Sequence, residues 1–321
     1  MIKINTYRLV SLLLVLSSLL TGCAGVGRTD ETEGSRDGIK ITDALGYEHY
    51  LTERPERVAA LIGSFADVWS LAGGSICATS EDAWEDFGLE LGDAVNIGGA
   101  HSPSLEKLLS AEPELVIASS STASNVALCE SLENMGITVA YFDVDNFDDY
   151  LSMLRICTEI TGRADLYEKN GEAVKAEADA IKTKFAEAEI SHDERRVLVL
   201  RVSSTSIKAK GSVSTILGEM LCELGCENIA DNDTSLLENL SAEGVIGAEP
   251  YRIFVVTMGK DEAHALDNLR EMIDSDPAWS TLSAVREKRI HLLDRTLFNL
   301  KPNARWAESY EKLYEIFTDA K

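Results

Sequence analysis

Residues 104–118 read SLEKLLSAEPELVIA, and residues 241–255 read SAEGVIGAEPYRIFV. The two stretches align without a gap at an offset of 137 residues, with five identities (Ser, Glu, Ala, Glu, Pro) and six further pairs of apolar residues. Each stretch has the order of a short helix, a Pro-containing turn and a buried strand. A supersecondary unit that occurs only twice at this distance predicts two similar lobes, because a solenoid needs three or more short repeats.

Short runs rich in apolar and β-branched residues recur along the chain, and amphipathic segments lie between most of them. The six runs are residues 57–62, 115–119, 138–142, 196–202, 252–257 and 289–293. Alternating strands and helices indicate parallel sheets with helices on both faces. The predicted fold class is therefore α/β, with two Rossmann-like lobes of parallel-rich sheet. Residues 39–42 and 47–51 flank a turn and are expected to form a hairpin that opens the first lobe.

A long helix is predicted between the two copies of the repeat. Residues 148–161 form one expected helix, and residues 164–189 contain no Pro and a single Gly. A continuous helix of that second segment would span about 39 Å and could join the lobes as a stiff connector. An ordinary solvated helix packed on one lobe is the alternative interpretation. The expected boundaries are an N-terminal lobe at 39–163, a connecting helix at 164–190 and a C-terminal lobe at 191–321.

The first residues have the pattern of a targeting segment. Lys3 and Arg8 precede a 12-residue run of Leu, Val and Ser at 9–20, which is too short to cross about 30 Å of hydrocarbon comfortably. The run ends in Leu-Thr-Gly-Cys at Cys23, which resembles the bacterial lipobox. We therefore predict a signal peptide at 1–22, lipidation of Cys23, and a flexible tether at 23–38 that attaches an exported protein to a membrane.

Charge and cysteine content exclude other classes. The 321 residues include 54 Asp and Glu against 30 Lys and Arg, for a formal net charge of -24. A surface this acidic repels phosphates, so a nucleic-acid partner is excluded. Beyond Cys23 the chain has five cysteines with scattered spacing, and an odd number is not a disulfide framework.

Several motifs in order resemble one protein family. They are the lipobox, ITDALG at 41–46, RPERV at 54–58, SPSLE at 102–106 followed by EPELVI at 112–117, and a long central helix before a second lobe. Together they resemble the iron-siderophore, haem and cobalamin class of ABC-transporter substrate-binding proteins, in which a helix joins the lobes. The resemblance covers residues 39–321.

The resemblance implies a function without catalysis. A cleft between the lobes would capture a small-molecule metal chelate, which could be a ferric siderophore, haem or cobalamin, and the protein would deliver it to an ABC permease dimer with its ATPase subunits. No resident cofactor is expected. We expect a monomer, held by its lipid anchor on the outer face of the cytoplasmic membrane.

The repeat contains one acidic residue in each lobe that matches the docking residues of this family. The resemblance implies that Glu106 and Glu243 meet arginines of the two permease subunits. Locally, Ser102 with Pro103 and, in the second copy, Ser241 are expected to cap short helices, so both glutamates fall in a first turn. Favourable interaction of a carboxylate with the helix dipole is the alternative reason for their presence.

Candidate ligand contacts follow the predicted strands, because ligands of open α/β sheets sit outside the carboxyl ends of the strands. Arg201 would pair with an anionic ligand or neutralise local carboxylates, and these alternatives stay open. The aromatic candidates could pack on a macrocycle or belong to the lobe cores. Met258 could ligate haem iron. The full set is Ser64, Phe65, Trp84, Ser121, Asp143, Arg201, Met258, Asn299 and Lys301, with Lys208, Lys210 and Phe298 as additions.

Two other functions compete with this interpretation. A binder of free Zn or Mn for an ABC importer would need three or four ligands, for which His101 is the only histidine candidate. A secreted hydrolase would need a nucleophile with its base, but the sequence has no Gly-x-Ser-x-Gly, His-Glu-x-x-His or Walker motif. Asp143 with Asp145 could mimic a carboxylate pair, although a loop near the two lobes explains them more simply.

Overall fold

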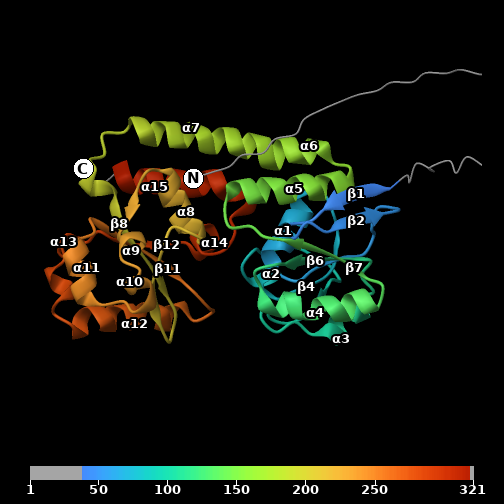
Figure 1. Ribbon diagram of the computed structural model, residues 1–321, viewed down its shortest axis with the longest axis horizontal. Coiled ribbons are helices and arrows are strands. Elements are labelled where there is room, and N and C mark those ends of the chain that lie inside the picture. Colours follow the sequence, from blue (N-terminus) through green and yellow to red (C-terminus); the bar gives the residue numbers. More distant parts are fainter. Residues whose placement is uncertain (1–37, 319–321) are drawn as a thin grey trace, which may run out of the picture. The chain divides into compact units, whose positions relative to one another are not determined.

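The computed structural model describes residues 38–318, so Cys23, the signal peptide and nearly all of the tether lie outside the described residues. A hairpin comes first, with β1 (Ile39–Thr42) antiparallel to β2 (Glu48–Leu51) (Figure 1). The buried carboxylate of Asp43 shapes its turn by accepting hydrogen bonds from the backbone N–H groups of Leu45 and Tyr47. A third bond, from the N–H of Tyr141, fixes the hairpin to the first lobe.

The first lobe is a five-stranded parallel sheet in the order β5-β4-β3-β6-β7. Its apolar strands are buried on both faces: alternate residues of β3 and β6 face a core with α1 and α5 on one side and a second core with α3 on the other. The elements are β3 (Val58–Ala60), α1 (Gly63–Leu71), β4 (Ile76–Thr79), α2 (Asp82–Glu85), β5 (Val95–Asn96), α3 (Leu105–Ser110), β6 (Leu115–Ser119), α4 (Ala123–Asn134), β7 (Thr138–Phe142) and α5 (Phe147–Thr161).

The second lobe repeats this arrangement with one change. Its parallel strands have the order β10-β8-β11-β12. The fifth strand, β9, pairs antiparallel with the carboxyl-terminal half of β8. Val197 and Val199 of β8 face one core, whereas Leu198 and Leu200 face another. The elements are β8 (Arg196–Val202), β9 (Ile207–Lys210), α8 (Ile216–Glu223), β10 (Glu227–Asn228), α9 (Ile229–Asn232), α10 (Ser235–Glu238), α11 (Ala242–Ala248), β11 (Arg252–Thr257), α12 (Glu262–Ser275), α13 (Ser283–Arg286), β12 (Ile290–Leu293), α14 (Arg295–Phe298) and α15 (Trp306–Thr318). The fold is α/β with two Rossmann-like lobes.

The segment between the lobes is helical but not a uniform α-helix. It consists of α6 (Ala164–Tyr167), a π-helical turn at Glu168–Glu172 and α7 (Ala173–Glu187). In the π turn, Asn170 is buried and donates from Nδ2 to the carbonyl of Leu71, while its own carbonyl accepts from the hydroxyl of Tyr150. These bonds attach the connecting helix to the first lobe, and its second half packs on α15 (Figure 1).

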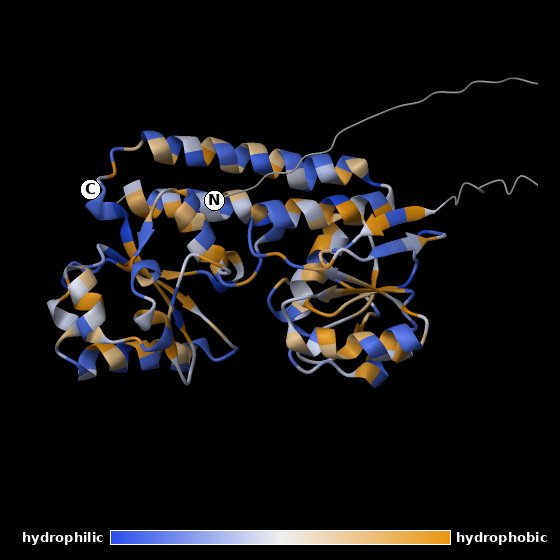
Figure 2. Cartoon of the chain, viewed as in Figure 1, coloured by the Kyte–Doolittle hydropathy of each residue, from blue (hydrophilic) through white to orange (hydrophobic). Residues whose placement is uncertain are grey.

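The core continues from one lobe to the other beneath these helices. Both lobes lie in one contact unit that begins at Gly38. The rings of Phe147 and Trp306 lie 5.4 Å apart between centroids, and Nδ2 of Asn303 donates to the carbonyl of Ser64. Figure 2 shows the apolar residues concentrated in the strands and on the inward sides of the helices. The helix side of the two lobes is therefore a packed apolar junction.

The sequence repeat is also a structural repeat. Glu112 and Glu249 occupy equivalent positions before a proline, and both have a left-handed backbone, with φ of 45° and 44°. The preceding carbonyls, of Ala111 and Ala248, accept hydrogen bonds from Arg57 and Arg196 at the start of the first strand of each lobe. The two lobes therefore share one way of joining a helix to the sheet.

Two smaller findings complete the fold. Every cysteine between residues 38 and 318 has a free thiol, at positions 77, 129, 157, 222 and 226. Within the same range, none of the helices is both long and apolar enough to span a membrane.

Candidate functional site

Three cations lie together at the carboxyl end of β8. Arg201 is directly opposite Lys208 in the β8–β9 pair, and Lys210 is opposite Val199 two residues along each strand. Because side chains alternate between the faces of a strand, Arg201, Lys208 and Lys210 lie on one face of the sheet. Like charges placed directly opposite one another destabilise a sheet, so this arrangement is costly for the fold alone.

Within the described part of the chain, no carboxylate pairs with these cations. Among residues 38–318, none of the three cations has an Asp or Glu oxygen within 4.0 Å of its nitrogen atoms, and Nε of Arg201 is buried without a hydrogen-bond partner. Burial lowers the pKa of Arg201. Burial also lowers the pKa of Lys210, and the positive charges of Arg201 and Lys208 lower it further. Of the two alternatives for Arg201, the structure thus gives no support to neutralisation of local carboxylates.

The three cations line a pocket of about 490 Å³, which we call the cation pocket. The β8–β9 turn adds the hydroxyl groups of Ser203, Ser204, Thr205 and Ser206, and the loop after β11 adds Met258 and Gly259. Hydroxyls and cations are donors of hydrogen bonds, so the pocket suits a ligand with several anionic oxygens. Met258 is 45% exposed and gives the pocket one apolar side.

A second pocket, of about 520 Å³, adjoins the first and shares Gly259 with it. We call it the inter-lobe pocket, because Glu85 and Asp86 of the first lobe line it together with residues of the second lobe. The second-lobe residues are Thr257, Gly259, Lys260, Glu262, Asp294, Arg295 and Thr296.

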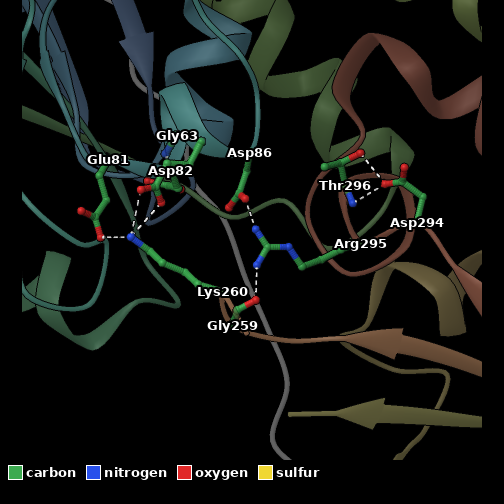
Figure 3. Close-up of polar contacts among 10 residues, drawn as sticks. Gly63, Glu81, Asp82, Asp86, Gly259, Lys260, Asp294, Arg295 and Thr296 are labelled. Atoms are coloured by element: carbon green, nitrogen blue, oxygen red, sulfur yellow. Dashed lines mark hydrogen bonds and ion pairs between the residues drawn. The ribbon is translucent and has the colours of Figure 1, made fainter. Parts of the chain in front are cut away.

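Ion pairs cross the inter-lobe pocket (Figure 3). Nζ of Lys260 lies 2.9 Å from Oε1 of Glu81 and 2.8 Å from Oε2 of Glu85. Arg295 pairs through Nη2 with Asp86 and donates through Nη1 to the carbonyl of Gly259 at 2.7 Å. Hydrogen bonds to Glu85 and Glu81 raise the pKa of Lys260. Two cations of the second lobe are thus neutralised by three carboxylates of the first.

A third cluster of charged side chains includes Asp143 and Lys301, which are two of the predicted ligand contacts. Lys301 is half-buried, and burial lowers the pKa of its amine, whereas the carboxylates of Asp145 and Asp143 oppose this shift. Burial and the neighbouring Asp143 in turn raise the pKa of Asp145. The structure therefore brings Lys301 of the second lobe into the electrostatic reach of the loop between β7 and α5.

The other predicted residues lie in different surroundings. Phe65 is fully buried in the core shared by the lobes, as is Phe298 at 1% exposure, so these rings are core residues and offer no surface to a ligand. Ser64 is also buried, and Trp84 is partly buried against the same core. Ser121 is exposed, and the side-chain oxygen of Asn299 is buried without a partner.

Glu106 and Glu243 are exposed at equivalent positions in the first turns of α3 and α11. The predicted cap Ser241 is confirmed, since its side chain accepts from the N–H of Gly244. The predicted cap at Ser102 is wrong: Ser104 caps α3 by accepting from the N–H of Lys107, and Pro103 precedes the helix. Ser104 is the repeat partner of Ser241, so the correction makes the two copies more alike.

The described residues do not form the site that a binder of free Zn or Mn would need. In the described part of the chain there is no group of three or more His, Cys, Asp or Glu side chains close enough to hold a metal ion. His101 is exposed, in the turn before α3.

Sequence reasoning missed the inter-lobe pairs. Lys260 and Arg295 each fall within three residues of a strand end, so the rule that selected Met258 and Arg201 could have found them. Their partners Glu81, Glu85 and Asp86 are ordinary surface acids in sequence. Only contacts between lobes distinguish them.

Comparisons with known proteins agree with this architecture. A model of the family described as periplasmic binding protein matches residues 59–297. The ABC transporter substrate-binding lipoprotein YvrC of Bacillus subtilis strain 168 is 21% identical over 96% of both chains. The Fe(3+)-citrate-binding protein YfmC of the same organism is 24% identical over 89% of both. Staphylococcus aureus SirA, solved in complex with staphyloferrin B, superposes with a TM-score of 0.64 at 21% identity, covering 86% of this chain and 96% of SirA.

The family match covers most of the chain, and the likeness to SirA extends over both lobes. The matched residues 59–297 include both copies of the repeat and the helical segment between the lobes. The chain therefore belongs to the periplasmic binding protein family.

Proposed function

We propose that the protein is an extracytoplasmic solute-binding lipoprotein that captures an anionic ferric chelate between its lobes and delivers it to an ABC permease. The observation that carries the choice of ligand is the cation pocket. Arg201, Lys208 and Lys210 have no carboxylate partner among residues 38–318, although the chain has a net charge of -24. Arg201 and Lys210 are partly buried, and unpaired cations in such positions destabilise a fold unless a ligand compensates them.

The chemistry of the pocket favours carboxylate-bearing chelates over the other ligands of the class. An Arg guanidinium matches a carboxylate in two-pronged geometry, and two lysines beside it add further charge-assisted hydrogen bonds. The name of the relative YfmC, an Fe(3+)-citrate-binding protein, points the same way. Asp143, Asn299 and Lys301 are candidates for additional contacts, together with Ser121.

Delivery and anchoring are parts of the same proposal. Glu106 and Glu243 are exposed once per lobe, as two subunits of a permease would require for a matched contact. Lipidation at Cys23 and the tether that follows would keep the protein near that permease. A solute-binding role also leaves no requirement for catalysis, and no observation favours the metal-ion or hydrolase alternative.

The test is native mass spectrometry of the purified protein with ferric citrate, a ferric catecholate, a ferric hydroxamate, haem and cobalamin, each at low and high salt. We expect one 1:1 complex with a carboxylate-bearing ferric chelate, weakened by salt because the contacts are ionic. Tight binding of cobalamin instead would contradict the proposed ligand class. Retention of Zn or Mn with no chelate bound would contradict the proposal as a whole and make His101 the residue to mutate.

A further inference from the structure

The row of cations at the cleft edge of the second lobe is divided into two sets. Within the part of the chain that the structure describes, Arg201, Lys208 and Lys210 have no carboxylate partner, whereas Lys260 and Arg295 are each held by carboxylates of the first lobe. The two sets lie in adjoining pockets that share Gly259. An anion entering the cleft therefore meets five cations, of which two already have anionic partners.

The pairs of the second set are well formed. Arg295 and Asp86 have side chains only 21% and 17% exposed, which limits screening by solvent and salt. Lys260 is more exposed, but its amine contacts two carboxylates at once. Asp86 and Glu85 line the inter-lobe pocket itself, so these carboxylates occupy the place at which a ligand carboxylate would meet Lys260 and Arg295.

We infer that Glu81, Glu85 and Asp86 determine specificity by acting as intramolecular competitors of the ligand, which reserve Lys260 and Arg295 and leave the cation pocket available to an anion. This inference rests on the proposed function, because it assumes that the ligand is anionic. Its consequence is selectivity: anions that would bind to any exposed pair of cations find Lys260 and Arg295 already neutralised. The same contacts join the lobes opposite the helical junction.

The decisive variant removes the three competing charges without changing their shape. Glu81→Gln, Glu85→Gln and Asp86→Asn, combined in one protein, leave Lys260 and Arg295 without anionic partners. The matched control is Asp179→Asn, which frees Lys175 on the connecting helix, away from both pockets. Thermal unfolding of both variants shows whether each is folded.

The first measurement needs no ligand. Lys260 of the wild-type protein should react several-fold more slowly with acetic anhydride than in the triple variant, because an amine held by two carboxylates spends less time in its neutral, reactive form. Quantification by mass spectrometry should show an unchanged rate at Lys208 in the same samples, and Asp179→Asn should leave Lys260 unaffected. Equal reactivity of Lys260 in wild type and triple variant would overturn the inference.

The second measurement is titration with ferric citrate at several salt concentrations. The triple variant should bind about tenfold more tightly than wild type, with a steeper salt dependence, because two more cations become available. Asp179→Asn should bind like wild type. Equal or weaker binding by the triple variant would overturn this inference alone, whereas absence of binding in all three proteins would overturn the proposed function and this inference with it.

Discussion

The two lobes have the same backbone plan but contribute opposite charges to the ion pairs that join them. Both place an Arg at the start of the first strand against the end of a short helix, and both follow that helix with a left-handed Glu. In the ion pairs at the cleft edge, however, the first lobe contributes carboxylates such as Glu81 and Asp86, and the second contributes the cations Lys260 and Arg295. Repetition thus fixes the skeleton, while the loops after the strands are free to diverge and to carry function.

The largest expected effect concerns the exposed glutamates that the two lobes carry at equivalent positions. Replacing Glu106 and Glu243 together by Arg should reduce uptake of the chelate by cells to the background level, because the proposed contact of each lobe with a permease subunit would then have its charge reversed. Affinity for the ligand in solution should not change, since both side chains are exposed away from the two pockets. Radiolabelled iron uptake and a binding titration measure the two quantities.

Glu130→Arg on α4 is the control for this double variant, because Glu130 is also exposed. Normal uptake by the double variant would remove the docking role. A loss of ligand affinity would move Glu106 and Glu243 into the binding site.

The second effect concerns the charge that distinguishes the lobes. Arg201→Met should weaken binding of the anionic chelate by at least about tenfold, because a charge-assisted contact is lost. It should also raise the free energy of unfolding by roughly 0.5–1 kcal/mol, since an unpaired, half-buried cation opposite Lys208 is removed. Titration and denaturant unfolding test both parts.

Arg270→Met is the matched control, because Arg270 is exposed and paired with Asp267 on its own helix. We expect it to change neither quantity appreciably. If Arg201→Met destabilised the protein and left affinity intact, Arg201 would be a structural residue.

The third effect tests whether the shared skeleton is equally important in both lobes. Arg57→Ala removes hydrogen bonds to the carbonyls of Ala111 and Glu112, and Arg196→Ala removes the equivalent bond to Ala248. Each change should lower the free energy of unfolding by about 1–2 kcal/mol. Denaturant unfolding of the two variants should give similar losses, and a large loss in one lobe alone would show that the repeat is not energetically equivalent.

The smallest expected effect concerns the two left-handed glutamates of the repeat, which differ in their hydrogen bonds. Glu112→Gly should stabilise the protein by roughly 0.5–1 kcal/mol, because Gly adopts the left-handed conformation without steric cost. Glu249→Gly should gain less, since it also loses the hydrogen bond from the N–H of Ser283 to Oε1 of Glu249. Thermal unfolding should rank Glu112→Gly above Glu249→Gly, and the reverse order would contradict the role assigned to that bond.

The predicted elements agree with the structure where the local signal is strong. Residues 115–119, 138–142, 196–202 and 252–257 form strands with the predicted bounds, because each consists mainly of apolar residues that are buried on both faces of a sheet. The six predicted runs do not include β5 and β10, of two residues each, which form only by pairing with a neighbour already in place. They also omit β4 and β9. In β9 lysines alternate with Ile207 and Ala209, so hydrophobicity alone gave a weak signal.

The predictions of site residues also depended on local signals. Position after a strand selected Arg201 and Lys301, and the repeat selected Glu106 and Glu243. The rule also selected Phe65, whose ring the first lobe uses for its core, because a strand-end position says nothing about which side of α1 faces inward.

The sequence by itself determined the α/β class, the duplication of the lobes and the family resemblance, because these depend on local hydrophobic patterns and on motifs within a few residues of each other. Only the tertiary structure decided which charges meet. Lys260 contacts Glu81 across 179 residues of chain, and Arg295 contacts Asp86 across 209. Whether a cation is neutralised or left for a ligand depends on the packing of one lobe against the other, and that packing has no signature in local sequence.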